Sequence, residues 1–202
     1  MKTSTLLGLF ISIFSFSAQA DFLVGWIGPL TGNAAVLGVD SVPAIQIAID
    51  QINKNGGIGG ETVKLLIEDD QYQASKTISA YHSLVHARGV KALFILTYGG
   101  LFALADRAEN DGVLIIDTLD CDEKIAALNR NIFCIAKTTE SLGINLAEQI
   151  LSKKSLPTAL IYFDGDPFMG TLAQSFLARL NKEGQTPKVI ETYNDATTDF
   201  QS

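Results

Sequence analysis

The chain has 202 residues, of which 47% are hydrophobic and 18% charged, which is typical of a globular protein with at least one sizeable core. Its formal net charge at pH 7 is −7. Because nucleic acids and anionic membrane surfaces attract basic proteins, this acidic balance argues against both as partners.

The first 20 residues have the pattern of a secretory signal peptide. Lys2 supplies the positive start, residues 6–16 form an apolar core, and residues 18–20 are Ala-Gln-Ala, a small-x-small cleavage signal. The alternative is a membrane anchor, but a core of about 11 residues is short for a bilayer that needs roughly 20. We therefore expect cleavage before Asp21, export to a periplasm, and no later segment that could span a membrane.

Residues 22–70 are predicted to form a strand, a helix and a second strand. Apolar runs at residues 22–27 and 63–67 indicate the two buried strands. Between them, apolar residues recur at helical spacing until the Asn-Gly-Gly sequence at residues 55–57, where glycine favours a helix end. The helical residues are Val42, Ile45, Ile49 and Ile52. This order predicts a βαβ unit with parallel strands.

Two stretches of this unit resemble the type I periplasmic solute-binding proteins, closest to their leucine/isoleucine/valine-binding branch. They are IGPLTG at residues 27–32 and AIDQINKNGGIGGETVKLLIEDDQ at residues 48–71. The resemblance covers residues 21–202. It implies two lobes that hinge shut on a small polar solute, with no cofactor and no enzyme chemistry.

Strands and helices alternate through the rest of the chain, which predicts an α/β fold with a parallel, doubly wound sheet. We expect strands at 92–96, 113–117, 132–135, 159–163 and 188–193, and helices at 74–88, 101–110, 123–128, 140–152 and 168–183.

The resemblance implies a first lobe at residues 21–138 and an incomplete second lobe at residues 139–202. Family members continue beyond this point, so we expect a truncated or split product that exposes apolar surface and binds weakly. The implied function is the solute-binding component of an ABC importer, acting with a permease. A ligand-sensing periplasmic module of a signalling system has the same fold and stays open as the alternative.

Ligands of open α/β sheets bind beyond the carboxyl ends of the strands, and the resemblance implies which residues lie there. They are Leu37 in the first loop, Tyr98, Gly99 and Gly100 in the second, Asp120 and Cys121 in the third, and Phe168 in the second lobe. The related branch holds a ligand carboxylate with Ser and Thr at the second loop. Because those hydroxyls are missing and Asp120 is anionic, we expect that the ligand is not simply leucine and that an amine-bearing or amide-like solute fits better than a bare carboxylate. The expected solute is therefore an amino acid, an amine or an amide. Ordinary loop packing is the alternative for Tyr98, Asp120 and Phe168.

The sequence also offers two less well supported alternatives, a dinucleotide-binding enzyme and a metal site. Asp69 and Asp70 end the second strand, as the ribose-binding acid of a dinucleotide site does, but the preceding loop lacks the G-x-G-x-x-G spacing. His82 and His86 lie one helical turn apart without a third ligand or the H-E-x-x-H pattern. We therefore predict a solvated helix face and no metal.

Cys121 and Cys134 are the only cysteines. Export favours their pairing, and they lie on or beside consecutive strands that we expect to be neighbours. The alternative is two separate thiols, one buried and one in the site.

Overall fold

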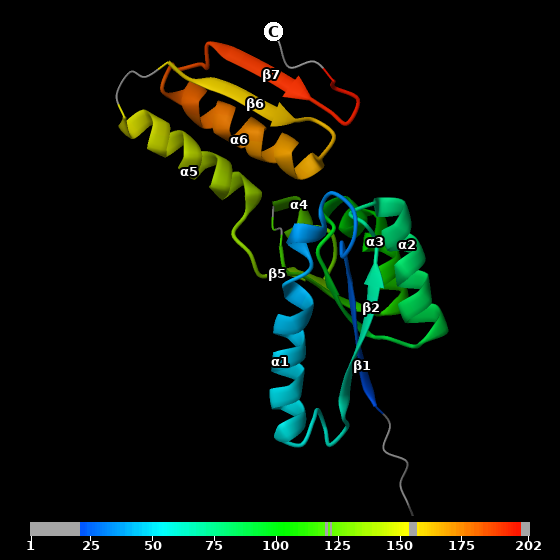
Figure 1. Ribbon diagram of the computed structural model, residues 1–202. Coiled ribbons are helices and arrows are strands. Elements are labelled where there is room, and N and C mark those ends of the chain that lie inside the picture. The colour runs from blue at the N-terminus through cyan, green and yellow to red at the C-terminus, as the bar shows by residue number, and fades with distance from the viewer. Residues whose placement is uncertain (1–20, 120, 122, 154–156, 199–202) are drawn as a thin grey trace, which may run out of the picture.

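The computed structural model describes residues 21–119, 121, 123–153 and 157–198, which form two units (Figure 1). The first unit contains a five-stranded parallel sheet with the order β2-β1-β3-β4-β5. Its strands are β1 (Phe22–Gly28), β2 (Val63–Asp69), β3 (Ala92–Ile95), β4 (Leu114–Asp117) and β5 (Ile132–Cys134). β1 pairs with β2 in parallel, which confirms the predicted βαβ unit.

Helices lie on both faces of this sheet, as in a doubly wound fold (Figure 1). They are η1 (Ala35–Leu37), α1 (Ser41–Lys54), α2 (Ala74–Tyr81), the π-helix η2 (His82–Ala87), α3 (Tyr98–Asp111) and α4 (Glu123–Ala126). The predicted helix over residues 74–88 is therefore an α-helix only as far as Tyr81. The predicted fold class is confirmed.

The two faces of the first sheet are covered unequally. Leu93, Ile95 and Ile115 lie in the main core with α2, η2 and α3, and they are almost fully buried. On the opposite face, α1 packs over β1 and β2. Side chains alternate between the faces of a sheet, so Ile116, next to Ile115, points to this opposite face. Its partner on β5 is Phe133, which is 53% exposed. This face is therefore open over β4 and β5.

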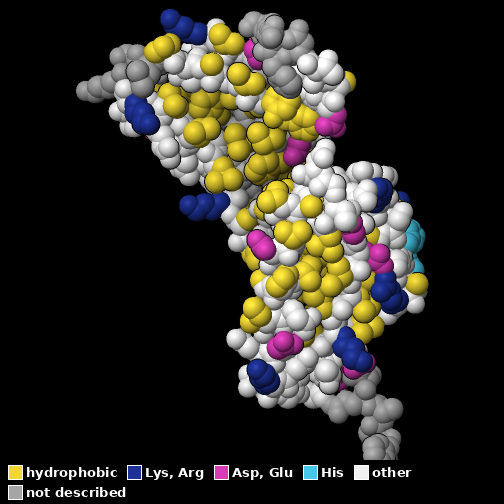
Figure 2. Space-filling model, viewed as in Figure 1, with side chains coloured by type: hydrophobic (Ala, Val, Ile, Leu, Met, Phe, Trp, Pro, Cys, Tyr) yellow, Lys and Arg dark blue, Asp and Glu magenta, His cyan; other side chains and the backbone are white. Residues whose placement is uncertain are grey.

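The second unit is smaller. It contains α5 (Thr139–Ser152), β6 (Ala159–Phe163), α6 (Pro167–Lys182) and β7 (Val189–Tyr193), with β6 and β7 forming a two-stranded parallel sheet. Its core is a separate cluster around Leu160, Phe176 and Leu180. Hydrophobic side chains are exposed on the viewed face of both units (Figure 2).

One stretch among the described residues, Ala35–Lys54, is long and apolar enough to cross a membrane by length and composition alone. The expectation that no segment after the leader meets this test is therefore wrong. The stretch contains α1, whose Ile49 is buried against Val24 and Val63 of the sheet. Core helices of soluble proteins pass the same test, so composition does not decide the role of this helix.

Candidate functional site

A cavity of about 500 Å³ lies between the first turns of α3 and α6. α3 follows β3 and α6 follows β6, so the cavity adjoins the carboxyl ends of strands from both units. Ligands of parallel α/β folds bind at this position. The cavity is lined by Tyr98, Gly99, Phe102, Lys124, Pro167, Gly170, Thr171 and Gln174.

Three residues expected at the site from the sequence lie at or beside this cavity. Tyr98 and Gly99 line it. They belong to the first turn of α3, not to a loop, because the helix begins at Tyr98 rather than at the expected residue 101. Phe168 packs against the first unit, with its ring centroid 6.3 Å from that of Tyr98. Tyr98 is buried, so its ring forms part of the wall.

Three other expected site residues, all among the described ones, are not part of the cavity lining. Gly100 faces α2, where a Cβ atom would come within 2.4 Å of the Thr77 hydroxyl oxygen. Leu37 is in η1 and 41% exposed. Cys121 is buried and disulfide-bonded. Asp120 lies outside the described residues.

The amino end of α3 has a polar group that the sequence analysis missed. Thr97 is the N-cap residue, with an extended backbone, and its side chain does not cap the helix. Its hydroxyl is buried without a hydrogen-bond partner among the described residues. The first N–H groups of a helix have no intrahelical acceptors and favour anions. A threonine immediately before a helix is a recognisable N-cap signal, so this residue could have been found.

Two further polar side chains at the cavity were also missed. Lys124 comes from α4 and Gln174 from the second turn of α6. Neither carries a sequence signal for binding, because a single exposed lysine or glutamine is common on any helix. Lys124 adds positive charge to the same cavity that the amino end of α3 lines. The arrangement is suited to a ligand with an anionic group and an apolar part.

The first loop is attached to the end of β2 by Asp69. Its carboxylate accepts hydrogen bonds from the Leu30 N–H at 2.9 Å and from the Thr31 hydroxyl at 2.5 Å. Burial acts to raise the pKa of Asp69, but the hydrogen bonds from Thr31, Leu30 and Gln71 outweigh it, so the pKa is lowered. Asp69 therefore serves as a structural anchor of the loop rather than as a ribose ligand.

Cys121 and Cys134 form a disulfide in the structure, with their Cα atoms 5.3 Å apart. The Cys121 carbonyl oxygen also accepts a hydrogen bond from the N–H of Thr139, the first residue of α5, at 2.6 Å. The bridge therefore lies at the point where the chain passes from the first unit to the second.

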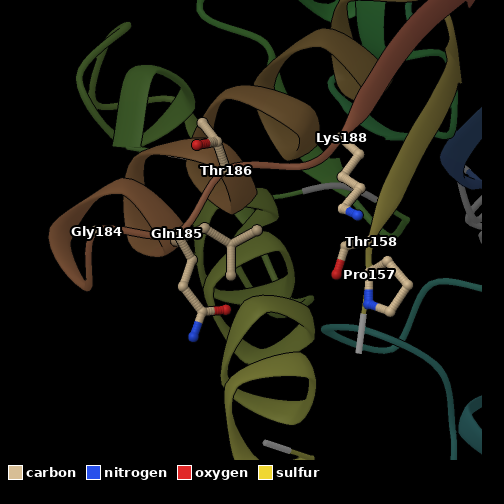
Figure 3. A pocket seen from close by; sticks show the side chains of 7 residues that line it. Pro157, Thr158, Gly184, Gln185, Thr186 and Lys188 are labelled. Carbon is tan, nitrogen blue, oxygen red and sulfur yellow. The ribbon is translucent and has the colours of Figure 1, made fainter. Parts of the chain in front are cut away.

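A second cavity, of about 390 Å³, lies at the other end of the second unit. Figure 3 shows its lining side chains, which come from the end of α6, from the turn after it and from the segments that lead into β6 and β7. It adjoins the amino ends of these strands. Because ligands of parallel sheets bind at the carboxyl ends, we do not assign this cavity to the site.

The two histidines lie on η2, away from the cavity. Their ring centroids are 4.8 Å apart, and His86 Nε2 is 3.3 Å from Asp111 Oδ2. The same carboxylate oxygen accepts a hydrogen bond from the Tyr81 hydroxyl, and burial together with Asp111 raises the pKa of Tyr81. No group of three or more potential metal ligands occurs among the described residues.

The sequence is similar to known solute-binding proteins along most of its length. It is 27% identical to Leu/Ile/Val-binding protein homolog 3 of Brucella melitensis, over 94% of this chain and 52% of that protein. It is 29% identical to the Leu/Ile/Val-binding protein BraC3 of Rhizobium johnstonii, over 98% of this chain and 54% of that protein. The chain thus spans about half the length of these curated relatives.

Solved structures show the same fold. The substrate-binding protein LivJ of Streptococcus pneumoniae, in complex with isoleucine, superposes with a TM-score of 0.77 at 22% identity, over 90% of this chain and 52% of that one. A solute-binding protein of Rhodopseudomonas palustris, in complex with 3,4-dihydroxybenzoic acid, superposes with a TM-score of 0.75 at 19% identity. The match covers 86% of this chain and 47% of that one. Residues 23–202 match the periplasmic binding protein family, and the chain belongs to this family, as its sequence resemblance predicted.

Proposed function

We propose that the chain is the solute-binding part of an ABC importer for amino acids or related small polar solutes. The observation that carries the proposal is the cavity of about 500 Å³ between α3 and α6. Its volume lies in the range of small-molecule sites, roughly 300–1,000 Å³. The relatives are Leu/Ile/Val-binding proteins, and LivJ is the substrate-binding protein of a branched-chain amino acid transporter; both descriptions support transport over the sensing alternative.

The chemistry of the cavity supports a ligand that carries a carboxylate. The amino end of α3 and the ammonium group of Lys124 both favour negative charge. Phe102 and Pro167 provide apolar surface for the rest of the ligand. The proposed role of Asp120, to bind an amine, concerns a residue outside the described part of the chain. A zwitterionic amino acid, including one with an amide side chain, satisfies both proposals.

The proposed mechanism is capture between two lobes that close by a hinge, without covalent chemistry. The boundary that we propose lies after residue 138, the N-cap of α5, where the chain leaves the first sheet. Export through the leader at residues 1–20 would deliver the protein to the periplasm, and an ABC permease would be its partner.

The test is a titration of isotope-labelled 21–202 protein with isoleucine, glutamine and 1,4-diaminobutane, followed by NMR because that method detects millimolar affinities. We expect one of the two amino acids to shift the amide signals of Gly99 and Thr171. Lys124→Ala should weaken that binding by about tenfold, as expected for a hydrogen bond to a charged group.

Lys188→Ala is the matched control, because Lys188 lines the cavity at the other end of the second unit. It should leave the affinity unchanged. The proposal fails if none of the three solutes shifts these signals, or if the two lysine variants weaken binding equally.

A further inference from the structure

The apolar side chains of the cavity between α3 and α6 share one property, which is that each of them is a ring. They are the aromatic rings of Tyr98 and Phe102 and the pyrrolidine ring of Pro167. Among the described residues, no leucine, isoleucine, valine or methionine lines this cavity. The apolar wall that a solute would contact is therefore aromatic rather than aliphatic.

The aromatic rings form an edge-to-face cluster. The ring centroids of Tyr98 and Phe102 are 5.0 Å apart with an angle of 64° between their planes, and those of Tyr98 and Phe168 are 6.3 Å apart at 75°. Aromatic pairs prefer such arrangements, with centroids about 4.5–7 Å apart, because the positive edge of one ring meets the negative face of the other. Tyr98 is buried and Phe102 is half-buried, so Phe102 offers the more accessible ring. One more ring in the cavity would extend the same cluster.

The α6 side of the cavity leaves room for a ring. Gly170 lines the cavity, and a Cβ atom at this position would meet no atom within 4 Å. Lys124 and Gln174 also line it, and both are exposed, so the polar groups lie where the cavity opens to solvent. The arrangement thus separates a ring-lined apolar part from a polar part that favours negative charge.

We propose that the solute of this site carries an aromatic ring as well as a carboxylate, as an aromatic amino acid or an arylalkanoic acid does. Its ring packs against Phe102, and its carboxylate lies toward Lys124 and the amino end of α3. An aliphatic group of the same size gains the same burial of apolar surface but not the edge-to-face attraction. This inference rests on the proposed function, because it names the class of solute that the same cavity binds.

The test compares solutes that differ only in the ring. The first pair is phenylalanine and cyclohexylalanine, and the second is 3-phenylpropionate and 3-cyclohexylpropionate, which lack the ammonium group. Isotope-labelled 21–202 protein is titrated with each and followed by NMR. We expect the aromatic member to bind about fivefold more tightly in each pair. Burial of apolar surface alone would not give this preference, because the cyclohexyl members have at least as much apolar surface.

Phe102→Leu should abolish the preference, because it removes the accessible ring and keeps an apolar side chain. The ratio of the two affinities within each pair should fall from about fivefold to less than about twofold. Phe133→Leu is the matched control, since Phe133 is a half-exposed ring on β5 outside the cavity lining, and it should keep the fivefold ratio. The fluorescence of the fully buried Trp26 reports whether the first unit of each variant is folded.

Gly170→Ala is a second variant that does not disturb the rings. Its methyl group meets no protein atom within 4 Å, so the fold should tolerate it. Because the methyl group takes up room beside the solute, it should weaken the binding of phenylalanine by about fivefold.

Equal affinities within the pairs, or tighter binding of the cyclohexyl members, would overturn the inference, as would a preference that persists in folded Phe102→Leu. If only one pair binds, the ratio within that pair decides. A parallel titration with isoleucine separates this inference from the proposed function. If isoleucine shifts the amide signals of Gly99 and Thr171 but phenylalanine binds no more tightly than cyclohexylalanine, the proposed function stands and the aromatic inference fails. If no solute shifts these signals, both fail.

Discussion

The two units of the chain differ in how completely their sheets are covered. In the first unit, five strands are covered on one face by α2, η2 and α3 and partly on the other by α1. In the second, α5 and α6 cover one face of only two strands. Ile161, on β6, is 65% exposed, and every residue of β7 is exposed. Parallel sheets are stable when both faces are covered, so the second unit should be the less stable one.

This difference predicts two separate unfolding transitions. The single tryptophan, Trp26, is fully buried in β1, so its fluorescence reports on the first unit alone. Amide exchange in α5 and α6 reports on the second. Together these two probes show whether the units unfold independently.

The largest expected effect is that of Leu104→Ala in the core of the first unit. Leu104 is fully buried, so its truncation should lower the free energy of unfolding by about 3–5 kcal/mol. Denaturant unfolding, followed by Trp26 fluorescence, measures this change in the free energy of unfolding. Leu180→Ala, in the core of the second unit, is the matched control and should move this transition by less than about 0.5 kcal/mol. Equal shifts would show that the units unfold together.

Removal of the disulfide should have the next largest effect. Replacing both Cys121 and Cys134 by serine opens a loop with a sequence separation of 13, and should cost about 2–3 kcal/mol at the Trp26 transition. Reduction of the wild-type protein should cause the same shift. A double variant as stable as the wild type would contradict the prediction.

Gly143→Ala tests the packing within the second unit. A Cβ atom at this position would come within 2.5 Å of the Leu172 carbonyl oxygen, so α5 and α6 must separate. We expect a loss of about 1–3 kcal/mol, seen as faster amide exchange in both helices and not at Trp26. At Gly170 of α6 a Cβ atom meets nothing within 4 Å, and Gly170→Ala should slow exchange instead.

The smallest expected effect is a pH dependence of the first unit. The native pKa of Asp69 is lowered from the ordinary value of 3.8, so its stabilising contribution is present above that pH and is lost as the pH falls through the lower native value. The loss should be no more than about 1 kcal/mol, because the side chain is partly exposed. The measurement is the free energy of unfolding against pH, followed by Trp26 fluorescence. In Asp69→Asn this free energy should fall less steeply at acid pH than in the wild type. An unchanged slope would exclude Asp69 as the source of the acid dependence.

Local patterns in the sequence were sufficient to predict the architecture of the first unit. Apolar runs and helical spacing act within a few residues, so the strands at residues 22–28 and 63–69 and the helix between them were predicted nearly at their observed bounds. The family resemblance rested on the same unit. The start of α3 was misplaced because Gly99 and Gly100 are poor helix formers, and burial of Tyr98 against the core overrides that preference.

The tertiary structure alone decided which side chains line the cavity between α3 and α6. Lys124 and Gln174 belong to helices of different units, and nothing near them in the sequence indicates that they line one cavity. The same holds for the edge-on ring contact between Tyr98 and Phe168, which are 70 positions apart in the chain. Residue type and spacing determined which strands and helices form, because those interactions are local. Only the packing of the first turn of α6 against the first unit brought these side chains together, since contacts between units depend on how the whole chain folds.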